Sequence, residues 1–364
     1  MRTDAVSAMA TRARGSCARM LPIPPSNFQS MTRRHLTAAV AVRPTLFNAL
    51  FSEQSQQDLA SLAALRYQEE DDRLSEDEMI ALVQDCEVAV TGWGTPPFSQ
   101  NVVDACPNLK LVAHSAGTIK HLLPDPVWSR GIKVVHAAAA IAPAVAEMTI
   151  LLMLMCRRDV HNISRRMHAG EKWPQPELGF ELGSTRVGVI GAGHTGRNVI
   201  KLLHGFSADI VVYDPYLSPE RAAELKVTRV SLEELMSTCP VITVQAPTTP
   251  ETYHMISKEH LAMIQDGALF INTARSHAVN ADALYEALKT NRFQAALDVF
   301  DSEPLAVDSR LRGLPNLVLT PHLAGKSEQA RKRQGALIVE QLQLYATGRP
   351  LTQEVTRDML ATMA

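Results

Sequence analysis

The chain has 364 residues, which is room for about two domains of ordinary size. It is 46% hydrophobic and 20% charged, as globular proteins are, and its net charge of −2 gives no basis for binding nucleic acid or an anionic membrane. We expect neither partner. The cysteines stand apart, with no CxxC pair or metal-ligand spacing, and this predicts free thiols, no metal site and a reducing compartment, the cytoplasm. They are Cys17, Cys86, Cys106, Cys156 and Cys239.

Residues 1–35 differ in composition from the rest. The first 30 residues contain four arginines and one acid, Asp4, and they end in a proline-rich stretch. Arginine-rich, acid-poor extensions include organelle transit peptides, which would place the protein in mitochondria. The alternative is a disordered tail, or a start codon upstream of a true start at Met31. We therefore expect an extension, disordered or targeting, over residues 1–35.

From about Leu36 the sequence alternates between strand and helix patterns. A helix is predicted over 46–65, and Ser75 and Glu78 form a capping box before another. Such alternation favours a parallel sheet with helices on both faces. The predicted strands are 38–42, 88–91, 109–114 and 133–136.

A nearly continuous apolar run, residues 137–156, raises the question of a membrane span. Pro143 and Glu147 interrupt it, and only 13 residues (144–156) separate the proline from Arg157. About 20 apolar residues are needed to cross a bilayer. The run instead predicts a buried helix from Pro143 to about His168, with the proline in its first turn, long enough to bridge two domains.

The segment from Arg186 to Asp214 carries the strongest motif. A β-branched run, 187–190, predicts a buried strand, and Gly191, Gly193 and Gly196 follow at G-x-G-x-x-G spacing. Apolar residues at 199, 202, 203 and 206 then mark one helix face, and a second strand, 210–213, ends in Asp214. In a dinucleotide site the glycines permit a tight turn, approach of the pyrophosphate and close packing of the helix on the strand, while the acid accepts from a ribose hydroxyl.

Polar groups follow the later predicted strands, at the edge where open α/β sheets bind ligands. Arg275 can grip a carboxylate with two nitrogens and polarise the adjacent carbonyl. His322 can exchange a proton with the hydroxyl near neutral pH, and Glu303 can orient the imidazole. With nicotinamide carrying the hydride, this set suits a 2-keto or 2-hydroxy carboxylate. The strands are 241–244, 269–272, 295–297 and 317–319, and a last helix is predicted over 326–348.

These motifs resemble those of the D-isomer-specific 2-hydroxyacid dehydrogenases, a family that includes phosphoglycerate, glycerate and hydroxypyruvate enzymes. The resemblance runs from about Leu36 to the C-terminus, with the motifs in family order. The spacings from Arg275 to Glu303 (28 residues) and from Glu303 to His322 (19 residues) suit the family's catalytic trio. The motifs are the fingerprint, Asn272–Arg275, Ala296–Phe300 with Glu303–Leu305, and Thr320–Gly325.

The resemblance implies an α/β fold of two Rossmann-like, doubly wound parallel-sheet domains. A flavodoxin-like substrate domain would combine residues 36–140 and 327–364, and an NAD-binding Rossmann domain would span 141–326. A homodimer built around the long helix is also implied. Arg275, Glu303 and His322 would be catalytic, and Ser115, Ala116, Gly117 and Arg275 would bind substrate. NAD would contact Gly191, Ala192, Gly193, His194, Thr195, Gly196, Asp214, Ala246, Pro247, Thr252, Thr273, Ala274, Asp298 (at the nicotinamide amide), His322 and Gly325.

The chain departs from the family pattern at the substrate loop. The usual A-G-x-G-x-D-N is replaced by Ser115–His121, so that the acid and the amide are missing while Lys120 and His121 stand nearby. Backbone amides near Ala116 and Gly117 could still hold a carboxylate. Ser276 replaces a common glycine and Gln245 a common histidine, and neither change touches the catalytic trio.

The motifs predict an NAD-dependent D-2-hydroxyacid dehydrogenase but leave two alternatives. A phosphite- or formate-type dehydrogenase would share the fold with a differently shaped pocket. A nucleotide-sensing binding protein, similar to the corepressors related to this family, could retain the trio without turnover. The substrate, the physiological direction and the oligomeric state are not determined by the sequence.

Overall fold

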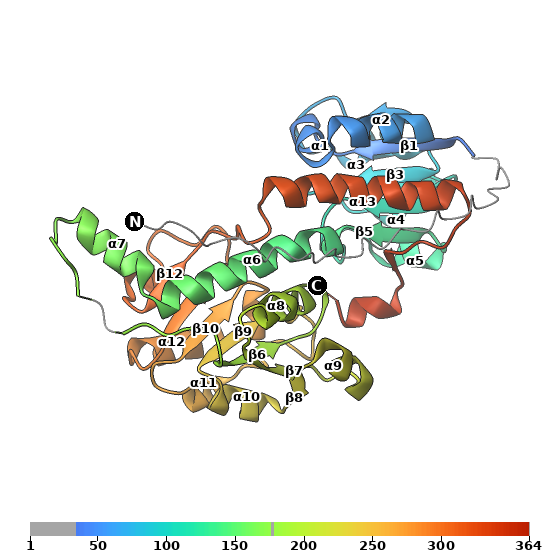
Figure 1. Ribbon diagram of the computed structural model, residues 1–364. Coiled ribbons are helices and arrows are strands. Elements are labelled where there is room, and N and C mark those ends of the chain that lie inside the picture. Colours follow the sequence, from blue (N-terminus) through green and yellow to red (C-terminus); the bar gives the residue numbers. More distant parts are fainter. Residues whose placement is uncertain (1–33, 176–177, 364) are drawn as a thin grey trace, which may run out of the picture. The chain divides into compact units, whose positions relative to one another are not determined.

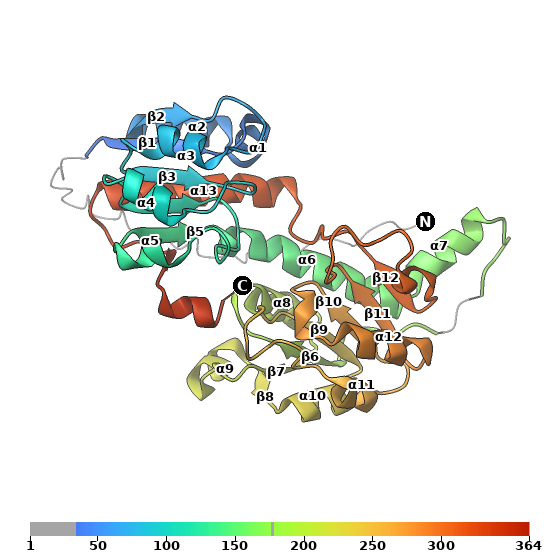
Figure 2. The same ribbon diagram turned by 180° about the vertical axis from the view of Figure 1, so that it is seen from behind.

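The computed structural model describes residues 34–175 and 178–363. The extension predicted for residues 1–35 therefore lies outside the described residues, except for Arg34 and His35. Two sheets organise the described chain, and Figures 1 and 2 show both with their helices.

The first sheet has the strand order β13-β5-β4-β3-β1-β2. Its five long strands are parallel and run in the flavodoxin-like order 2-1-3-4-5, and β13 adds an antiparallel edge beside β5. The strands are β1 (Leu36–Ala41), β2 (Ala63–Tyr67), β3 (Val88–Thr91), β4 (Leu111–His114), β5 (Lys133–His136) and β13 (Glu354–Val355).

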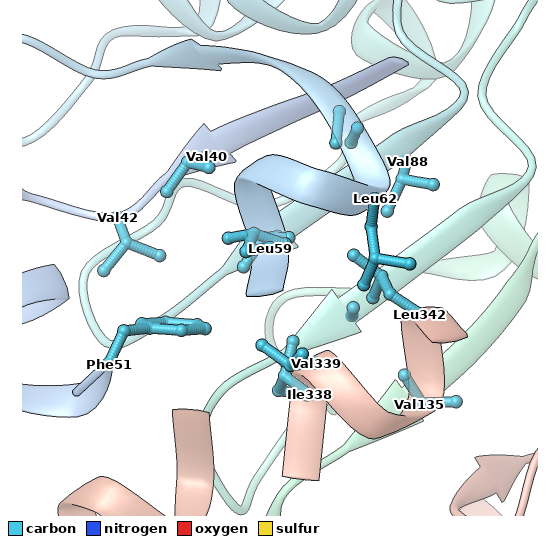
Figure 3. Close-up of a cluster of buried hydrophobic side chains, with 14 of the residues drawn as sticks. Val40, Val42, Phe51, Leu59, Leu62, Val88, Val135, Ile338, Val339 and Leu342 are labelled. Carbon is cyan, nitrogen blue, oxygen red and sulfur yellow. The ribbon is translucent and has the colours of Figure 1, made fainter. Parts of the chain in front are cut away.

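Helices cover both faces of this sheet, as its buried β-branched strands require. Alternate residues of β1 point to opposite cores. Val40 packs with Leu59 and Ile338 on one face (Figure 3), whereas Ala39 packs with Met79 on the other. The helices are α1 (Pro44–Leu50), α2 (Glu53–Leu62) and α13 (Glu328–Ala346) on the first face, and α3 (Glu76–Val83), α4 (Gln100–Ala105) and α5 (Asp125–Ser129) on the second.

The second sheet is wholly parallel, in the order β12-β11-β10-β9-β6-β7-β8. Counted from its first strand, β6, this is the Rossmann order 3-2-1-4-5-6 with a seventh strand at the edge, which confirms the predicted fold class. The strands are β6 (Arg186–Ile190), β7 (Asp209–Tyr213), β8 (Thr228–Arg229), β9 (Val241–Val244), β10 (Leu269–Asn272), β11 (Gln294–Leu297) and β12 (Leu317–Leu319).

Two further cores enclose this second sheet. One packs β6 through Val187 against the apolar face of α8, and the other packs Ile190 against Leu235 of α10. The helices are α8 (His194–His204), α9 (Pro219–Leu225), α10 (Leu232–Thr238), α11 (Lys258–Met263) and α12 (Ala281–Lys289). Short 3-10 turns occupy Ser276–Ala278, Arg310–Gly313 and Asp358–Ala361.

The long helix α6 (Ala138–Arg157) packs against both sheet systems, touching α13 on one side and α8, β10 and β11 on the other. Within the described chain it alone is long and apolar enough to cross a membrane, with a mean hydropathy of 2.0 over its most apolar window. Half of that window is buried inside the structure. Packing within the protein therefore accounts for its apolar sequence. Strands of the first sheet come from 36–136 and 354–355 and those of the second from 186–319; the exact domain boundaries stay a prediction.

The single helix predicted over 46–65 is wrong. The chain forms α1 and α2 there, separated at Phe51 and Ser52, and then the strand β2. Ser52 caps α2, because its hydroxyl accepts from Ser55 N. The alanines and leucines of 62–65 favour a helix, but pairing with β1 places residues 63–67 in the sheet.

The helix predicted from Pro143 to His168 is also wrong in its bounds. The helix α6 begins five residues before Pro143, so that the proline lies inside it. A left-handed residue, Asp159 (φ 50°), then separates α6 from α7 (Val160–His168). Phe206, expected on the buried face of α8, lies beyond the helix end and is partly exposed. The strands β8 and β13, of two residues each, were not predicted from the sequence.

We expect His114, at the end of β4, to make the fold sensitive to acid. It is 2% exposed, and burial, reinforced by His136 and His121, lowers its pKa from 6.5 to about 3. The unfolded chain therefore binds a proton that the folded protein refuses, so stability present above pH 6.5 is lost as the pH falls toward 3. Between pH 7 and pH 5 the loss from this one group is about 2 kcal/mol.

Urea unfolding of the parent and of His114→Gln at both pH values measures this effect. Other buried histidines also titrate, so the prediction concerns the difference between the variant and the parent. Between pH 7 and pH 5 the free energy of unfolding of the variant should fall by about 2 kcal/mol less than that of the parent. His168→Gln, at an exposed position on α7, should behave as the parent does. An identical loss in the parent and in His114→Gln would contradict the prediction.

Candidate functional site

The turn between β6 and α8 can be built only with glycine at two positions. Gly191 has φ +96°, and a Cβ there would lie 2.9 Å from Ala246 N. A Cβ on Gly196 would lie 2.0 Å from Gly191 O, inside van der Waals contact. These two glycines therefore let α8 pack closely on β6, as the motif predicts.

The middle glycine opens onto free space. A Cβ on Gly193 would meet no atom within 4 Å, and this residue caps the N-terminus of α8. Backbone N–H groups of a helix N-terminus attract anions. Burial, with the nearby charge of Arg197, lowers the pKa of His194 in the first turn, so its imidazole is neutral near pH 7. The turn fits a dinucleotide pyrophosphate, held by backbone N–H groups.

A cavity of about 520 Å³ adjoins this turn and contains Asp214. The Asp214 carboxylate accepts from Ala192 N (2.7 Å) through one oxygen and from Tyr216 N (2.8 Å) through the other. Each oxygen has a second lone pair, which leaves capacity for ribose hydroxyls. Seven of the predicted cofactor residues line the cavity: Gly191, Ala192, Gly193, Asp214, Ala246, Pro247 and Thr252.

Several lining residues were not predicted from the sequence. Arg197 and Arg221 both line the cavity, although Arg221 is seven residues beyond Asp214 in the chain. Arg221 pairs with Glu224, and Arg197 donates to Ala192 O. Tyr216 donates to Glu251, 2.5 Å away, at the cavity wall. Only the Asp-Pro-Tyr order after β7 could have drawn attention to Tyr216.

The hydroxyl of Thr273 takes part in a buried network. It lies 2.7 Å from Thr149 Oγ1 of α6, and Gln245 Nε2 donates to it over 3.0 Å. Thr273 is 5% exposed, so this side chain supports the loop from behind. Its predicted cofactor contact would have to come from its backbone.

Arg275 follows β10 on a loop that Asn272 shapes. Asn272 Nδ2 donates to Arg275 O (2.9 Å), and Asn272 Oδ1 accepts from Ala274 N (3.1 Å). Arg275 Nη1 donates to Ala274 O, and burial lowers the pKa of this guanidinium while Glu303 opposes that effect. The guanidinium remains charged near pH 7, because an arginine side chain keeps its proton far above neutrality.

His322 and Glu303 meet as predicted. His322 Nδ1 lies 2.6 Å from Glu303 Oε2, and the other carboxylate oxygen accepts from Phe300 N. Because a carboxylate only accepts, Nδ1 carries the proton and Nε2 is left free for the reacting group. His322 has φ +49°, a left-handed conformation uncommon outside glycine and found preferentially at functional positions.

Asp298 holds the loop that carries His322. Its buried carboxylate accepts from Thr320 Oγ1 (2.6 Å), Leu323 N (2.9 Å) and Ala324 N (2.8 Å). The predicted contact with the nicotinamide amide stays a prediction beside this supporting role. Of the other predicted cofactor residues, Thr195 lies in the first turn of α8, Ala274 precedes Arg275, and Gly325 faces Ile141 of α6.

The loop after β4 presents a row of free amide groups. The carbonyl oxygens of Ser115, Ala116 and Gly117 all accept hydrogen bonds from the first sheet and α13. In a trans peptide the next N–H points the opposite way, and among the described residues no acceptor bonds the N–H of Ala116, Gly117 or Thr118. Ala116 is fully buried, whereas Gly117 and Thr118 are partly exposed, so the N–H groups of the last two are the ones that can meet an anion. Lys120 of this loop donates to Thr248 O, beside the cofactor cavity.

Comparisons with known proteins agree with this geometry. Residues 150–324 match the family profile described as "D-isomer specific 2-hydroxyacid dehydrogenase, NAD binding domain". The hydroxypyruvate reductase of Thermotoga maritima is 33% identical over 275 residues, covering 74% of this chain and 88% of that protein. The glyoxylate reductase of Korarchaeum cryptofilum is 32% identical over 276 residues, covering 74% and 82%.

A D-3-phosphoglycerate dehydrogenase of Methanocaldococcus jannaschii is 34% identical over 278 residues, which cover 76% of this chain and 52% of that protein. The chain thus spans about half the length of that relative. Among solved structures, the D-lactate dehydrogenase of Escherichia coli in its apo form is similar, with a TM-score of 0.69 and 26% identity, covering 88% of this chain and 99% of that one.

The glycine turn predicts opposite outcomes for two small substitutions. Gly193→Ala meets no protein atom, so it should fold with an unchanged melting temperature but raise the Kd for NADH about tenfold or more by occupying the pyrophosphate space. Gly196→Ala must displace Gly191 O and should lower the melting temperature as well. Calorimetry of NADH binding and thermal melts measure both. Unchanged NADH binding by Gly193→Ala would remove this turn from the cofactor site.

Proposed function

Since the chain belongs to the family of D-isomer specific 2-hydroxyacid dehydrogenases, we propose that it is an NAD-dependent enzyme that interconverts a 2-keto acid and a D-2-hydroxy acid. The observation that carries the proposal is the His322–Glu303 hydrogen bond of 2.6 Å, which lies on the same sheet edge as Arg275. The oriented imidazole and the partly buried guanidinium supply the two groups that reduction of a keto acid requires.

The proton is handled by His322. In reduction, protonated Nε2 donates to the oxygen that becomes the hydroxyl, and in oxidation the neutral nitrogen accepts that proton. Glu303 holds Nδ1 and so keeps the ring oriented in both directions. Nicotinamide, when bound, supplies or accepts the hydride. Because Arg275 is charged and partly buried, it can stabilise the negative charge that develops on the carbonyl oxygen.

The substrate carboxylate has two candidate partners. One is Arg275, whose planar guanidinium can bond the carboxylate and the carbonyl together. The other is the row of free N–H groups after β4, of which those at Gly117 and Thr118 are partly exposed. These amides recognise any small 2-keto carboxylate, because they contact the group that all such substrates share. The rest of the substrate would be selected by residues beside this row, where Lys120 stands in place of the family's acid and amide.

We further propose a homodimer formed through α6 and the segment after it. Leu151 is 55% exposed and Leu154 37% exposed, and both lie on α6, half of whose most apolar window is buried inside the structure. Exposed apolar side chains concentrated in one segment mark protein interfaces. The second copy of this chain is the expected occupant. Further exposed members of the segment are Val160, Met167, Trp173, Leu178 and Phe180.

Turnover of glyoxylate, pyruvate and hydroxypyruvate with NADH, compared with NADPH, tests the enzyme proposal. We expect reduction of at least one acid and preference for NADH, because Asp214 would face the 2′-phosphate of NADPH. Arg275→Lys keeps the charge but loses the bidentate grip, so kcat/KM should fall roughly 100-fold while the Kd for NADH holds. Arg292→Lys, at a surface ion pair with Asp266, is the matched control.

His322→Asn should abolish reduction and retain NADH binding, since it removes the proton donor alone. A protein that binds NADH and reduces no acid on the panel would point to the nucleotide-sensing alternative. Full activity of Arg275→Lys would remove that residue from the site.

The dimer proposal predicts a light-scattering mass of twice the 39.9 kDa chain. Leu151→Glu should halve that mass, because an ionised side chain would be buried at the interface. Val307→Glu changes an equally apolar residue that is 91% exposed on a loop of the second sheet, and this variant should remain dimeric. A parent of single-chain mass at micromolar concentration would rule out the interface.

A further inference from the structure

The row of free amides after β4 depends on three hydrogen bonds made by the carbonyl oxygens of the same peptides. Each successive carbonyl oxygen is held by a different donor, and only the middle donor is a backbone group. Because each peptide is planar and trans, a held carbonyl fixes the direction of the following N–H. The bonds are Gln334 Nε2 to Ser115 O (2.5 Å), Ala137 N to Ala116 O (2.9 Å) and His136 Nδ1 to Gly117 O (2.7 Å).

Among the described residues, no other contact of Gln334 requires a polar side chain. It lies on α13 among apolar positions such as Ile338 and Val339 of the core (Figure 3), and its side chain is fully buried. Its Nε2 donates only to Ser115 O, and among the described residues its Oε1 has no hydrogen-bond partner. An apolar side chain of similar volume would remove that unsatisfied oxygen. The amide is therefore explained by the loop and not by the helix core.

His136 plays the matching part on the far side of the loop. It ends β5, is 7% exposed, and donates from Nδ1 to Gly117 O, since a carbonyl oxygen can only accept. Burial lowers the pKa of this imidazole, so the neutral ring with its proton on Nδ1 is the form present near pH 7. Gly117 offers little steric resistance to a change in backbone direction, so this bond is what orients the Gly117–Thr118 peptide.

We propose that Gln334 and His136 are positioning residues that fix this loop so that the amides of Gly117 and Thr118, which are partly exposed, face the substrate carboxylate. This rests on the proposed function, because it assigns the anion at those amides to a 2-keto acid. The middle peptide is held by the backbone N–H of Ala137, and a side-chain substitution does not remove that hydrogen bond. The two outer peptides are held by side chains alone, so the site has two points at which its carboxylate affinity can be changed without touching a catalytic residue.

Gln334→Met tests the first point, with Gln341→Met as its matched control. Gln341 lies two turns further along α13, is equally buried, and holds Thr352 and Gln353 through its amide. We expect Gln334→Met to raise the KM for glyoxylate and the Kd for oxamate about tenfold or more, with kcat and the Kd for NADH changed less than about threefold. Gln341→Met should leave all four values near those of the parent.

His136 allows a rescue experiment. In His136→Asn the side-chain amide can reach Gly117 O much as Nδ1 does, whereas His136→Leu leaves that oxygen without a side-chain donor. We expect the leucine variant to weaken oxamate binding about tenfold or more and the asparagine variant to recover most of the loss. Melting temperatures are measured beside the affinities, because a purely structural role would lower stability in both variants and leave the KM unchanged.

Oxamate binding to the NADH-loaded protein separates this proposal from the proposed function. If the parent binds oxamate in a Gln334-dependent way but reduces no 2-keto acid, the positioning proposal holds and the enzyme proposal fails. If the parent reduces glyoxylate and Gln334→Met and His136→Leu bind oxamate as tightly as the parent, the positioning proposal is wrong. The positioning proposal is equally wrong if oxamate does not bind to the parent, or if Gln341→Met weakens oxamate binding as much as Gln334→Met does.

Discussion

One buried carboxylate holds the geometry on which the proposed chemistry depends. Asp298 directly follows β11, and its two oxygens accept three hydrogen bonds from the segment between Thr320 and Ala324. A buried anion is costly unless it is fully hydrogen-bonded, so these donors cannot be withdrawn without a large loss of stability. The arrangement keeps His322 in its left-handed conformation and its Nδ1 against Glu303. The acid–base pair is thus imposed by the strand beside it.

Both sheets use backbone N–H groups where an anion is expected. The N-terminus of α8 faces the space above Gly193, and the loop after β4 presents the amides of Gly117 and Thr118. His194 and His136, close to these groups, are kept neutral near pH 7 by burial. Anion binding at both places consequently depends on fixed dipoles, which do not titrate in the physiological range. The one strong cation assigned to substrate is Arg275, whose charge is retained at any physiological pH.

The long helix α6 contributes to the site as well as to the core. Its Thr149 hydroxyl lies in the buried network with Thr273 and Gln245, directly behind the loop that carries Arg275. The side of α6 that is not buried carries Leu151 and Leu154. A subunit contact on that side would stiffen the helix whose other side supports the catalytic loop, which gives dimer formation a physical connection to activity.

The sequence by itself determined the features that depend on local backbone requirements. The glycine turn, the acid after β7 and the capping box of α3 are written in neighbouring residues, because sterics and short hydrogen bonds decide them. The proposed catalytic trio could be found as well, since each member follows a strand and parallel strands end at one edge. The strand β2, and with it the break between α1 and α2, could not be predicted from the sequence. Pairing with β1 overrides the helix preference of residues 62–65.

Only the tertiary structure decided the supports of the site. Gln334 lies 219 residues from Ser115, Thr149 lies 124 residues from Thr273, and Asp298 lies 22 to 26 residues from its donors. No periodicity or motif marks such partners, because each bond exists only once the helices have packed on their sheets. Arg221 is seven residues beyond Asp214 in the chain, and the helix α9 places it in the cavity with Asp214. Long-range hydrogen bonds and close packing, which no local pattern encodes, are what complete this site.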